Sequence, residues 1–201
     1  MCNKVISMKL AIFLFFALTL STGFSQTIED WTPEFQLKLS DFQSPQTEIS
    51  KDLTSYSIYS GSNMDFSFQM SSFEFLFTKN FNSKVKTTFN RSAAVITAPD
   101  STTALQLVKF GQYSFDLTEL YSRKFRQRMY EEKGTFSNAN FFKPIFENLQ
   151  EEMNAESARV LKTTDLGREA ELLDLEHQKV KNEIGELSNF CFDCKPPKKK
   201  R

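Results

Sequence analysis

Three ionisable side chains with helical spacing are the residues best placed to do chemistry together in this sequence. Asp116, Glu119 and Arg123 stand at positions i, i+3 and i+7 of a helix-forming stretch, so one helix face would carry all three. Two carboxylates on one face can do acid–base work if burial raises the pKa of one of them, and the cluster could also bind a cation or a substrate carboxylate. The interpretation that we favour is an ion-pair ladder, which would stabilise the helix by about a few tenths of a kcal/mol.

Histidine chemistry is restricted, because the 201 residues include a single histidine. A zinc site built on two or three histidines is therefore excluded, and a Ser-His-Asp or Cys-His arrangement would have to use His177. This residue stands between Glu176 and Gln178 in a charged segment. The sequence predicts an exposed imidazole without a catalytic role.

The N-terminus has the features of a secretory signal. Lys4 and Lys9 precede an apolar run of 11 residues, 10–20, which is too short to span a bilayer. We expect residues 1–25 to form a signal peptide that is cleaved before Gln26, although Met8 is an alternative start. The mature protein would be secreted or periplasmic, and would have no membrane span after cleavage.

The two remaining cysteines, Cys191 and Cys194, are expected to form one disulfide, because exported proteins fold in oxidising compartments. A thioredoxin-like redox pair is the alternative, but such pairs begin a helix and this one follows the last expected helix. Residues 191–201 would form a basic, cysteine-containing tail. Its end, PPKKKR, is similar to a nuclear localisation signal; in an exported chain it would instead be a solvated tail that contacts an acidic surface or anionic lipid weakly.

Charge and composition exclude several classes of protein. The chain has 25 basic and 25 acidic residues, and this balance argues against a dedicated nucleic-acid binder. Hydrophobic residues make up 40% of the sequence, which is enough to build a core. We expect no nucleic-acid partner and no cofactor, and we expect residues 26–190 to form a single domain.

The composition changes near residue 100, from Ser, Thr, Phe and Tyr to Glu, Lys, Arg, Leu and Gln. This order predicts an α+β fold with an antiparallel sheet in the N-terminal half and three long helices in the C-terminal half. Alternating or apolar patterns predict strands at 55–59, 64–70, 73–77, 84–89 and 93–97. Helical spacing and end signals predict helices at about 101–133, 142–162 and 167–187.

The segment 110–126 resembles a family of secreted bacterial proteins classed as zinc peptidases of unknown function, whose central helix carries HExxHFD and a following TEL-x-A-R-like stretch. Phe115-Asp116, Thr118-Glu119-Leu120 and Arg123 match these elements. Residues 37–45 resemble an upstream island of the family, with Leu39 where Trp is usual, and Trp31 fits an earlier tryptophan. The resemblance implies a zincin-like fold.

The residues that the family's chemistry needs are replaced. The positions of the first metal ligand, the general base and the second ligand hold Phe110, Gly111 and Ser114, and the third ligand position holds Glu171. A catalytic zinc needs about three protein ligands and a nearby base. We therefore expect no metal, and a secreted non-catalytic zincin-like protein that acts as a binding or structural module for an unidentified protein or surface ligand. The alternative is a hydrolase with rebuilt carboxylate chemistry around Asp116, Glu119 and Glu171.

Overall fold

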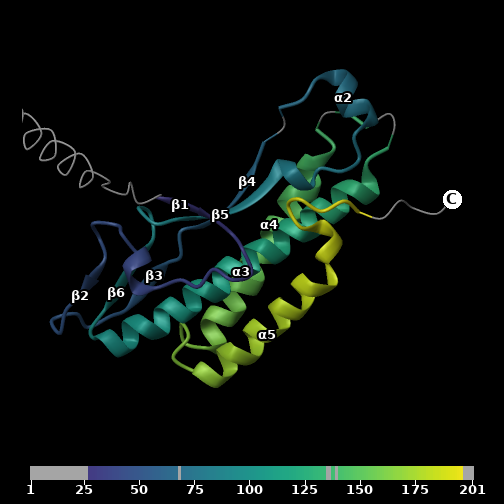
Figure 1. Ribbon diagram of the computed structural model, residues 1–201. Coiled ribbons are helices and arrows are strands. Elements are labelled where there is room, and N and C mark those ends of the chain that lie inside the picture. The colour runs from purple at the N-terminus through teal and green to yellow at the C-terminus, as the bar shows by residue number, and fades with distance from the viewer. Residues whose placement is uncertain (1–26, 68, 135–136, 139, 197–201) are drawn as a thin grey trace, which may run out of the picture.

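A computed structural model describes residues 27–196, except residues 68, 135, 136 and 139 (Figure 1). The predicted signal peptide, its cleavage point before Gln26 and residues 197–201 of the basic tail lie outside the described residues. The predicted α+β class is confirmed: short strands occur before residue 99 and three long helices follow residue 100. No helix in the described part of the chain has the length and apolar character needed to cross a bilayer.

The strands form two small sheets. One is antiparallel, in the order β1 (Ile28–Asp30), β5 (Val85–Asn90) and β4 (Ser62–Phe66). The other has the order β2 (Glu48–Ile49), β6 (Val95–Ala98) and β3 (Ser57–Tyr59), in which β2 runs parallel to β6. The prediction of one antiparallel sheet is therefore wrong, because the described strands form two sheets and one of these contains a parallel pair.

The chain passes between the two sheets twice, once from β3 to β4 and once from β5 to β6, and the two connections lie close together. The turn from β3 to β4 passes through Gly61, whose φ of 69° is a conformation that favours glycine. A Cβ atom on Gly61 would lie 2.7 Å from the carbonyl oxygen of Asn90, where β5 ends and the chain turns towards β6. The two crossings therefore depend on this one close approach.

The strand predicted at 73–77 is wrong, because this segment is the helix α2 (Ser72–Phe77). The side chain of Ser71 caps the helix by accepting a hydrogen bond of 3.1 Å from the backbone N–H of Glu74. Phe73 and Phe77 then stack one turn apart, with ring centroids separated by 4.8 Å. The alternation of Phe residues suits a strand, but this local cap and the i, i+4 pair favour the helix.

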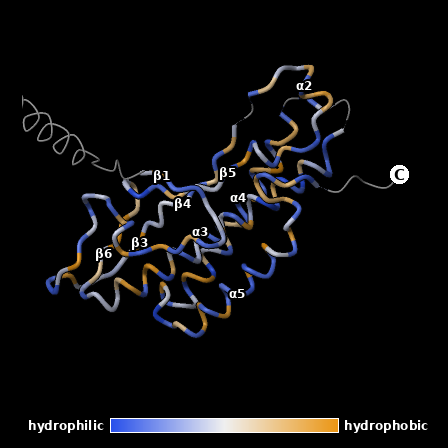
Figure 2. Tube along the Cα trace, viewed as in Figure 1, coloured by the Kyte–Doolittle hydropathy of each residue, from blue (hydrophilic) through white to orange (hydrophobic). Residues whose placement is uncertain are grey.

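The long helix α3 (Ser101–Glu132) is the centre of the molecule. Asp100 caps it through a hydrogen bond of 2.8 Å from the N–H of Thr103, as the sequence predicts. The helix packs against α4 (Phe142–Thr163) and α5 (Ala170–Glu186), and against β4, β5 and β6 (Figure 1). Hydrophilic and hydrophobic positions alternate along α5 (Figure 2). By contrast, α3 is buried on nearly every side between residues 107 and 126.

Within the described residues, three short 3-10 helices complete the frame: η1 (Leu39–Asp41), η2 (Asn82–Lys84) and η3 (Ser188–Phe190). The aromatic core near the second sheet joins Phe42, at the end of η1, to Phe89 of β5 and Phe115 of α3, with successive ring centroids 5.6 and 5.7 Å apart. Polar side chains on the same stretch of α3 therefore lie beside close aromatic packing.

Candidate functional site

Glu119 of α3 is the centre of a buried charge network. Its Oε1 atom accepts hydrogen bonds from Arg123 Nε at 2.8 Å and from Arg126 Nη1 at 3.0 Å, and its Oε2 atom accepts one from the Thr87 hydroxyl at 2.8 Å. Glu119 is only 3% exposed and both arginines are also buried. The i, i+4 pair of the expected ladder is therefore present, but it lies inside the protein rather than on a solvated face.

The two arginines connect the network to distant parts of the chain. Arg123 donates to the carbonyl of Ile184 near the end of α5, at 2.9 Å. Arg126 donates to the carbonyls of Val85 in β5 and Phe190 in η3, both at 2.9 Å, and burial lowers the pKa of its guanidinium. One residue cluster thus ties α3, α5, β5 and η3 together.

The network carries a net positive charge, because two guanidinium groups share one carboxylate. No second carboxylate in the described part of the chain forms an ion pair with Arg123 or Arg126. The Nη2 group of Arg123 forms no hydrogen bond within the described residues, and its guanidinium lies 5.3 Å from the centroid of the Trp31 ring. Uncompensated buried charge is costly, so this region favours an anionic group.

Asp116 belongs to a separate cluster one turn earlier in α3. Its Oδ1 atom accepts a hydrogen bond of 2.7 Å from Trp31 Nε1, and Gln112 Nε2 lies 3.4 Å from both carboxylate oxygens. The Nε2 atom of His177 lies 2.5 Å from Asp116 Oδ2. The prediction of an exposed histidine is wrong, because α5 turns His177 inward onto this carboxylate and its side chain is only 14% exposed.

The four positions that the family resemblance assigns to zinc chemistry lie in different surroundings in the fold. Phe110 is buried, and Gly167 of the α4–α5 connection lies so close that a Cβ there would be 3.2 Å from the Phe110 Cβ. A Cβ on Gly111 would lie 2.9 Å from the ring of Phe42, so packing fills the space of a larger side chain. The Ser114 hydroxyl donates to the Phe110 carbonyl at 3.0 Å, while Glu171 is exposed in the first turn of α5.

A cavity of about 440 Å³ opens above Glu119, and we call it the Trp31–Phe192 cavity. Its floor consists of Thr87, Glu119, Arg123 and Arg126. Its walls come from residues 30–33, from Lys86 and from residues 191–193. A volume of this size suits a small organic ligand. Trp31 and Phe192 give the walls aromatic surface, while Asp30, Lys86 and Asp193 make the walls charged as well. The net positive charge is therefore confined to the floor, where the anionic group of a ligand with an apolar part would bind.

A second cavity of about 380 Å³ shares Trp31, Pro33 and Arg123 with the first. It also contacts Asp116 and Lys181, so we call it the Asp116–Lys181 cavity. Trp31 therefore separates the two polar clusters and contributes to both. Among the described residues, no three His, Cys, Asp or Glu side chains form a group that could hold a metal ion.

The predicted Cys191–Cys194 disulfide is confirmed. We call residues 191–194 the disulfide loop. The carbonyl of Cys194 accepts hydrogen bonds from Asn80 Nδ2 at 3.1 Å and from Asn82 Nδ2 at 2.8 Å, so the loop is fixed against η2. It thereby forms one wall of the Trp31–Phe192 cavity instead of being an incidental part of the tail.

A further cluster, which the sequence analysis missed, lies between α4 and α5. The guanidinium of Arg159 donates from Nη2 to Glu156 and to Glu176, at 2.7 Å in each case, and Lys179 donates to Glu176 at 3.0 Å. Hydrogen bonding to Arg159 lowers the pKa of both carboxyl groups. The third helix is rich in charged residues, and one of its carboxylates, that of Glu176, is buried.

Arg126 and Gln112 also belong to the polar clusters, although neither residue was predicted to do so. Arg126 follows Glu119 by seven residues and Gln112 precedes it by seven, so the helical spacing that selects Asp116, Glu119 and Arg123 extends to both.

No family model, no curated protein and no solved structure matches this chain.

Proposed function

We propose that this protein is an exported, non-catalytic binding module that holds a small anionic ligand in the Trp31–Phe192 cavity. The observation that supports this function is the charge of the floor, where Arg123 and Arg126 share the carboxylate of Glu119. A bound carboxylate would accept hydrogen bonds from the remaining Arg123 donors, and such charge-assisted bonds are stronger than neutral ones. Trp31 and Phe192 would contact the apolar part of the ligand.

The exported, zincin-like part of the proposal rests on the sequence. The basic start and the apolar run at residues 10–20 support export. The Phe115-Asp116, Thr118-Glu119-Leu120 and Arg123 elements support descent from a zincin-like peptidase. Phe110, Gly111 and Ser114 support loss of the ancestral reaction, because none of them supplies an imidazole or a carboxylate. In this proposal the ancestral helix is retained as the floor of a binding site.

Ligand-induced stabilisation tests the binding function. Phenylacetate and 3-phenylpropionate are the probes, and their neutral amides are the controls. At ten times the Kd, a carboxylate probe should add about 1.4 kcal/mol of stability, which corresponds to a rise of roughly 3–6 °C in Tm for a domain of this size. The amides should add much less.

Two variants locate the bound probe. Arg123→Gln should remove the Tm shift, and Phe192→Ala should weaken it without changing the floor. Arg128→Gln is the matched control, because Arg128 forms an exposed ion pair with Glu152 and does not line the cavity. Equal shifts with the amides, or an undiminished shift in Arg123→Gln, would contradict the proposal.

A second candidate function uses the Asp116–His177 pair as a general base, and one observation favours it. A carboxylate that holds a histidine in a fixed orientation is the arrangement found behind nucleophiles in hydrolases. Of the three carboxylates in the original hydrolase alternative, Glu119 is engaged by two arginines and Glu171 is exposed. Hydrolysis of nitrophenyl esters that is lost in both His177→Ala and Asp116→Asn, but retained in Glu171→Gln, would favour this candidate over the non-catalytic module.

A further inference from the structure

The charged groups of the Trp31–Phe192 cavity are sorted by depth. Arg123 and Arg126, on the floor, are both buried. Asp30 and Asp193, on the walls, are both exposed to solvent. A ligand that enters the cavity therefore meets carboxylates near the opening and an excess of positive charge at the bottom.

The two wall carboxylates differ in their partners. Asp30 is paired with Lys86, whose Nζ atom lies 2.6 Å from Asp30 Oδ2 and 2.9 Å from Oδ1. The carboxylate of Asp193 forms no ion pair or hydrogen bond within the described residues. Its negative charge is therefore available to a ligand at the opening, as the excess positive charge of the floor is at the bottom.

Contacts within the protein fix the walls that lie between these two charges. The guanidinium of Arg123 lies 5.3 Å from the centroid of the Trp31 ring, and the Nζ atom of Lys86 lies 5.7 Å from that of the Phe192 ring. Asp193 belongs to the disulfide loop, which hydrogen bonds hold against η2. A ligand that matches a site formed in advance loses less free energy to ordering when it binds.

We propose that the ligand is a zwitterion whose carboxylate and ammonium groups stand at opposite ends of an apolar spacer; this inference rests on the function proposed above. The carboxylate would bind Arg123 on the floor, and the ammonium would lie at the opening beside Asp193. The spacer would pack between Trp31 and Phe192. A cavity of 440 Å³ is about 8 Å across if its dimensions are equal, so the spacer is longer than the single carbon of an α-amino acid.

The placement of charge favours this class over an α-amino acid and over a simple carboxylate. In an α-amino acid the ammonium stands beside the carboxylate, so it would be brought against the guanidinium groups of the floor and repelled. Glu119 does not offset this repulsion, because its carboxylate already accepts hydrogen bonds from both arginines and from Thr87. A simple carboxylate leaves Asp193 without a partner. A zwitterion with separated charges matches both ends of the cavity.

Titrations followed by the fluorescence of Trp31, the single tryptophan of the chain, test the inference. Phenylacetate is the reference, 4-(aminomethyl)phenylacetate adds an ammonium at the far end of the ring, and phenylglycine adds one beside the carboxylate. We expect the Kd of 4-(aminomethyl)phenylacetate to be about three- to fivefold lower than that of phenylacetate, as for an exposed ion pair, and the gain to shrink as salt rises. Acetylation of its amine should abolish the gain. Phenylglycine should bind at least about threefold more weakly than phenylacetate.

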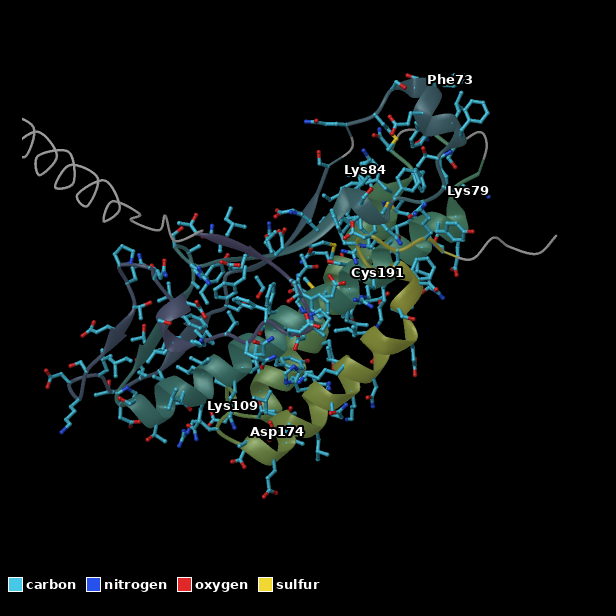
Figure 3. The ribbon with its side chains drawn as sticks, viewed as in Figure 1. Phe73, Lys79, Lys84, Lys109, Asp174 and Cys191 are labelled. Carbon is cyan, nitrogen blue, oxygen red and sulfur yellow. A yellow bond between two sulfur atoms is a disulfide. The ribbon has the colours of Figure 1, made fainter. Side chains whose placement is uncertain are left out.

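Asp193→Asn should remove the difference in Kd between phenylacetate and 4-(aminomethyl)phenylacetate. Asp174→Asn is the matched control and should preserve it, because Asp174 is an exposed carboxylate near the start of α5, whereas Cys191 follows the other end of that helix (Figure 3). Equal Kd values for the two compounds in the parent protein, or a difference that persists in Asp193→Asn, would overturn the inference and leave the proposed function standing. Absence of any phenylacetate binding would overturn both.

Discussion

His177 and Asp116 lie 61 positions apart in the chain, yet the Nε2 atom of one is 2.5 Å from the Oδ2 atom of the other. This contact joins α5 to the middle of α3 beside Trp31, which donates to the same carboxylate. The Nε2 atom of Gln112, on α3 itself, lies 3.4 Å from both oxygens of Asp116. One carboxylate therefore contacts side chains from α3, from α5 and from the segment that contains Trp31. The free energy of coupling between Asp116 and His177 can therefore be measured by mutating both residues.

A double-mutant cycle measures that coupling. Asp116→Ala, His177→Ala and the double variant should give a coupling free energy of about 1.5–3 kcal/mol, the range for hydrogen bonds to charged groups. Denaturant unfolding supplies the free energies. The exposed Gln178–Asn182 pair on the same helix, mutated in the same way, should give less than about 0.5 kcal/mol. Equal coupling in the two cycles would contradict the role assigned to Asp116.

Glu119→Gln should be among the most destabilising substitutions of a single charge. It keeps the side-chain shape but leaves Arg123 and Arg126 without an ionic partner inside the protein, at a cost of about 3–5 kcal/mol. Glu183→Gln is the control, because Glu183 pairs with Lys124 at the surface, and its cost should stay below about 1 kcal/mol. Urea unfolding at pH 7 measures both. Similar costs for the two variants would show that the buried network contributes little.

Phe110→Ala should cost about 3–5 kcal/mol, because it opens a cavity beside the α4–α5 connection. Phe73→Ala, at a 73% exposed position, should stay within about 0.5 kcal/mol. Elemental analysis of the same preparations should find zinc far below one equivalent, because Phe110, Gly111 and Ser114 offer no metal ligands of useful strength. One equivalent of zinc that disappears on mutating Glu171 or His177 would show that the alignment with the zinc peptidases misplaces the ligands.

The disulfide should leave no free thiol at Cys191 or Cys194 in the purified protein. Iodoacetamide without reductant should label neither Cys191 nor Cys194, and mass spectrometry reads the result. Reduction should cost about 2 kcal/mol or less, because the closed loop is short. It should also weaken probe binding in the Trp31–Phe192 cavity, since the loop forms one of its walls. Full labelling of the unreduced protein would indicate a reduced pair and a redox or reducing-compartment role.

The helices could be read from the sequence because their signals are local. Asp100 caps α3 as expected, and the apolar spacing in the last hundred residues locates α4 and α5 to within a few positions. In residues 71–77 the local signals conflict, because alternating Phe residues favour a strand and the capping side chain of Ser71 favours a helix. The division into two sheets depends on the contact between Gly61 and Asn90, which no local pattern contains.

The polar site was predictable only within α3. Helical spacing places Asp116, Glu119 and Arg123 near one another, and the same spacing would have added Arg126. Whether these groups face solvent or the interior depends on which elements cover α3, and that is a tertiary property. The partner of Asp116 on α5 and the cavity wall supplied by the disulfide loop arise from contacts between distant segments, so the sequence gives them no periodic signal.

The Arg159 cluster predicts loss of stability in acid. Arg159 lowers the pKa of Glu156 and Glu176 below the ordinary value of 4.5, so in the folded protein both carboxyl groups hold their charge to lower pH than in the unfolded chain. As pH falls below about 4.5, the unfolded chain takes up protons first, and stability is lost as pH falls through the lowered folded-state values. Urea midpoints should therefore decrease from pH 6 to pH 3. Glu176→Gln should reduce this decrease, whereas Glu171→Gln, an exposed change on the same helix, should preserve it. An unchanged pH dependence in Glu176→Gln would show that other carboxylates govern acid unfolding.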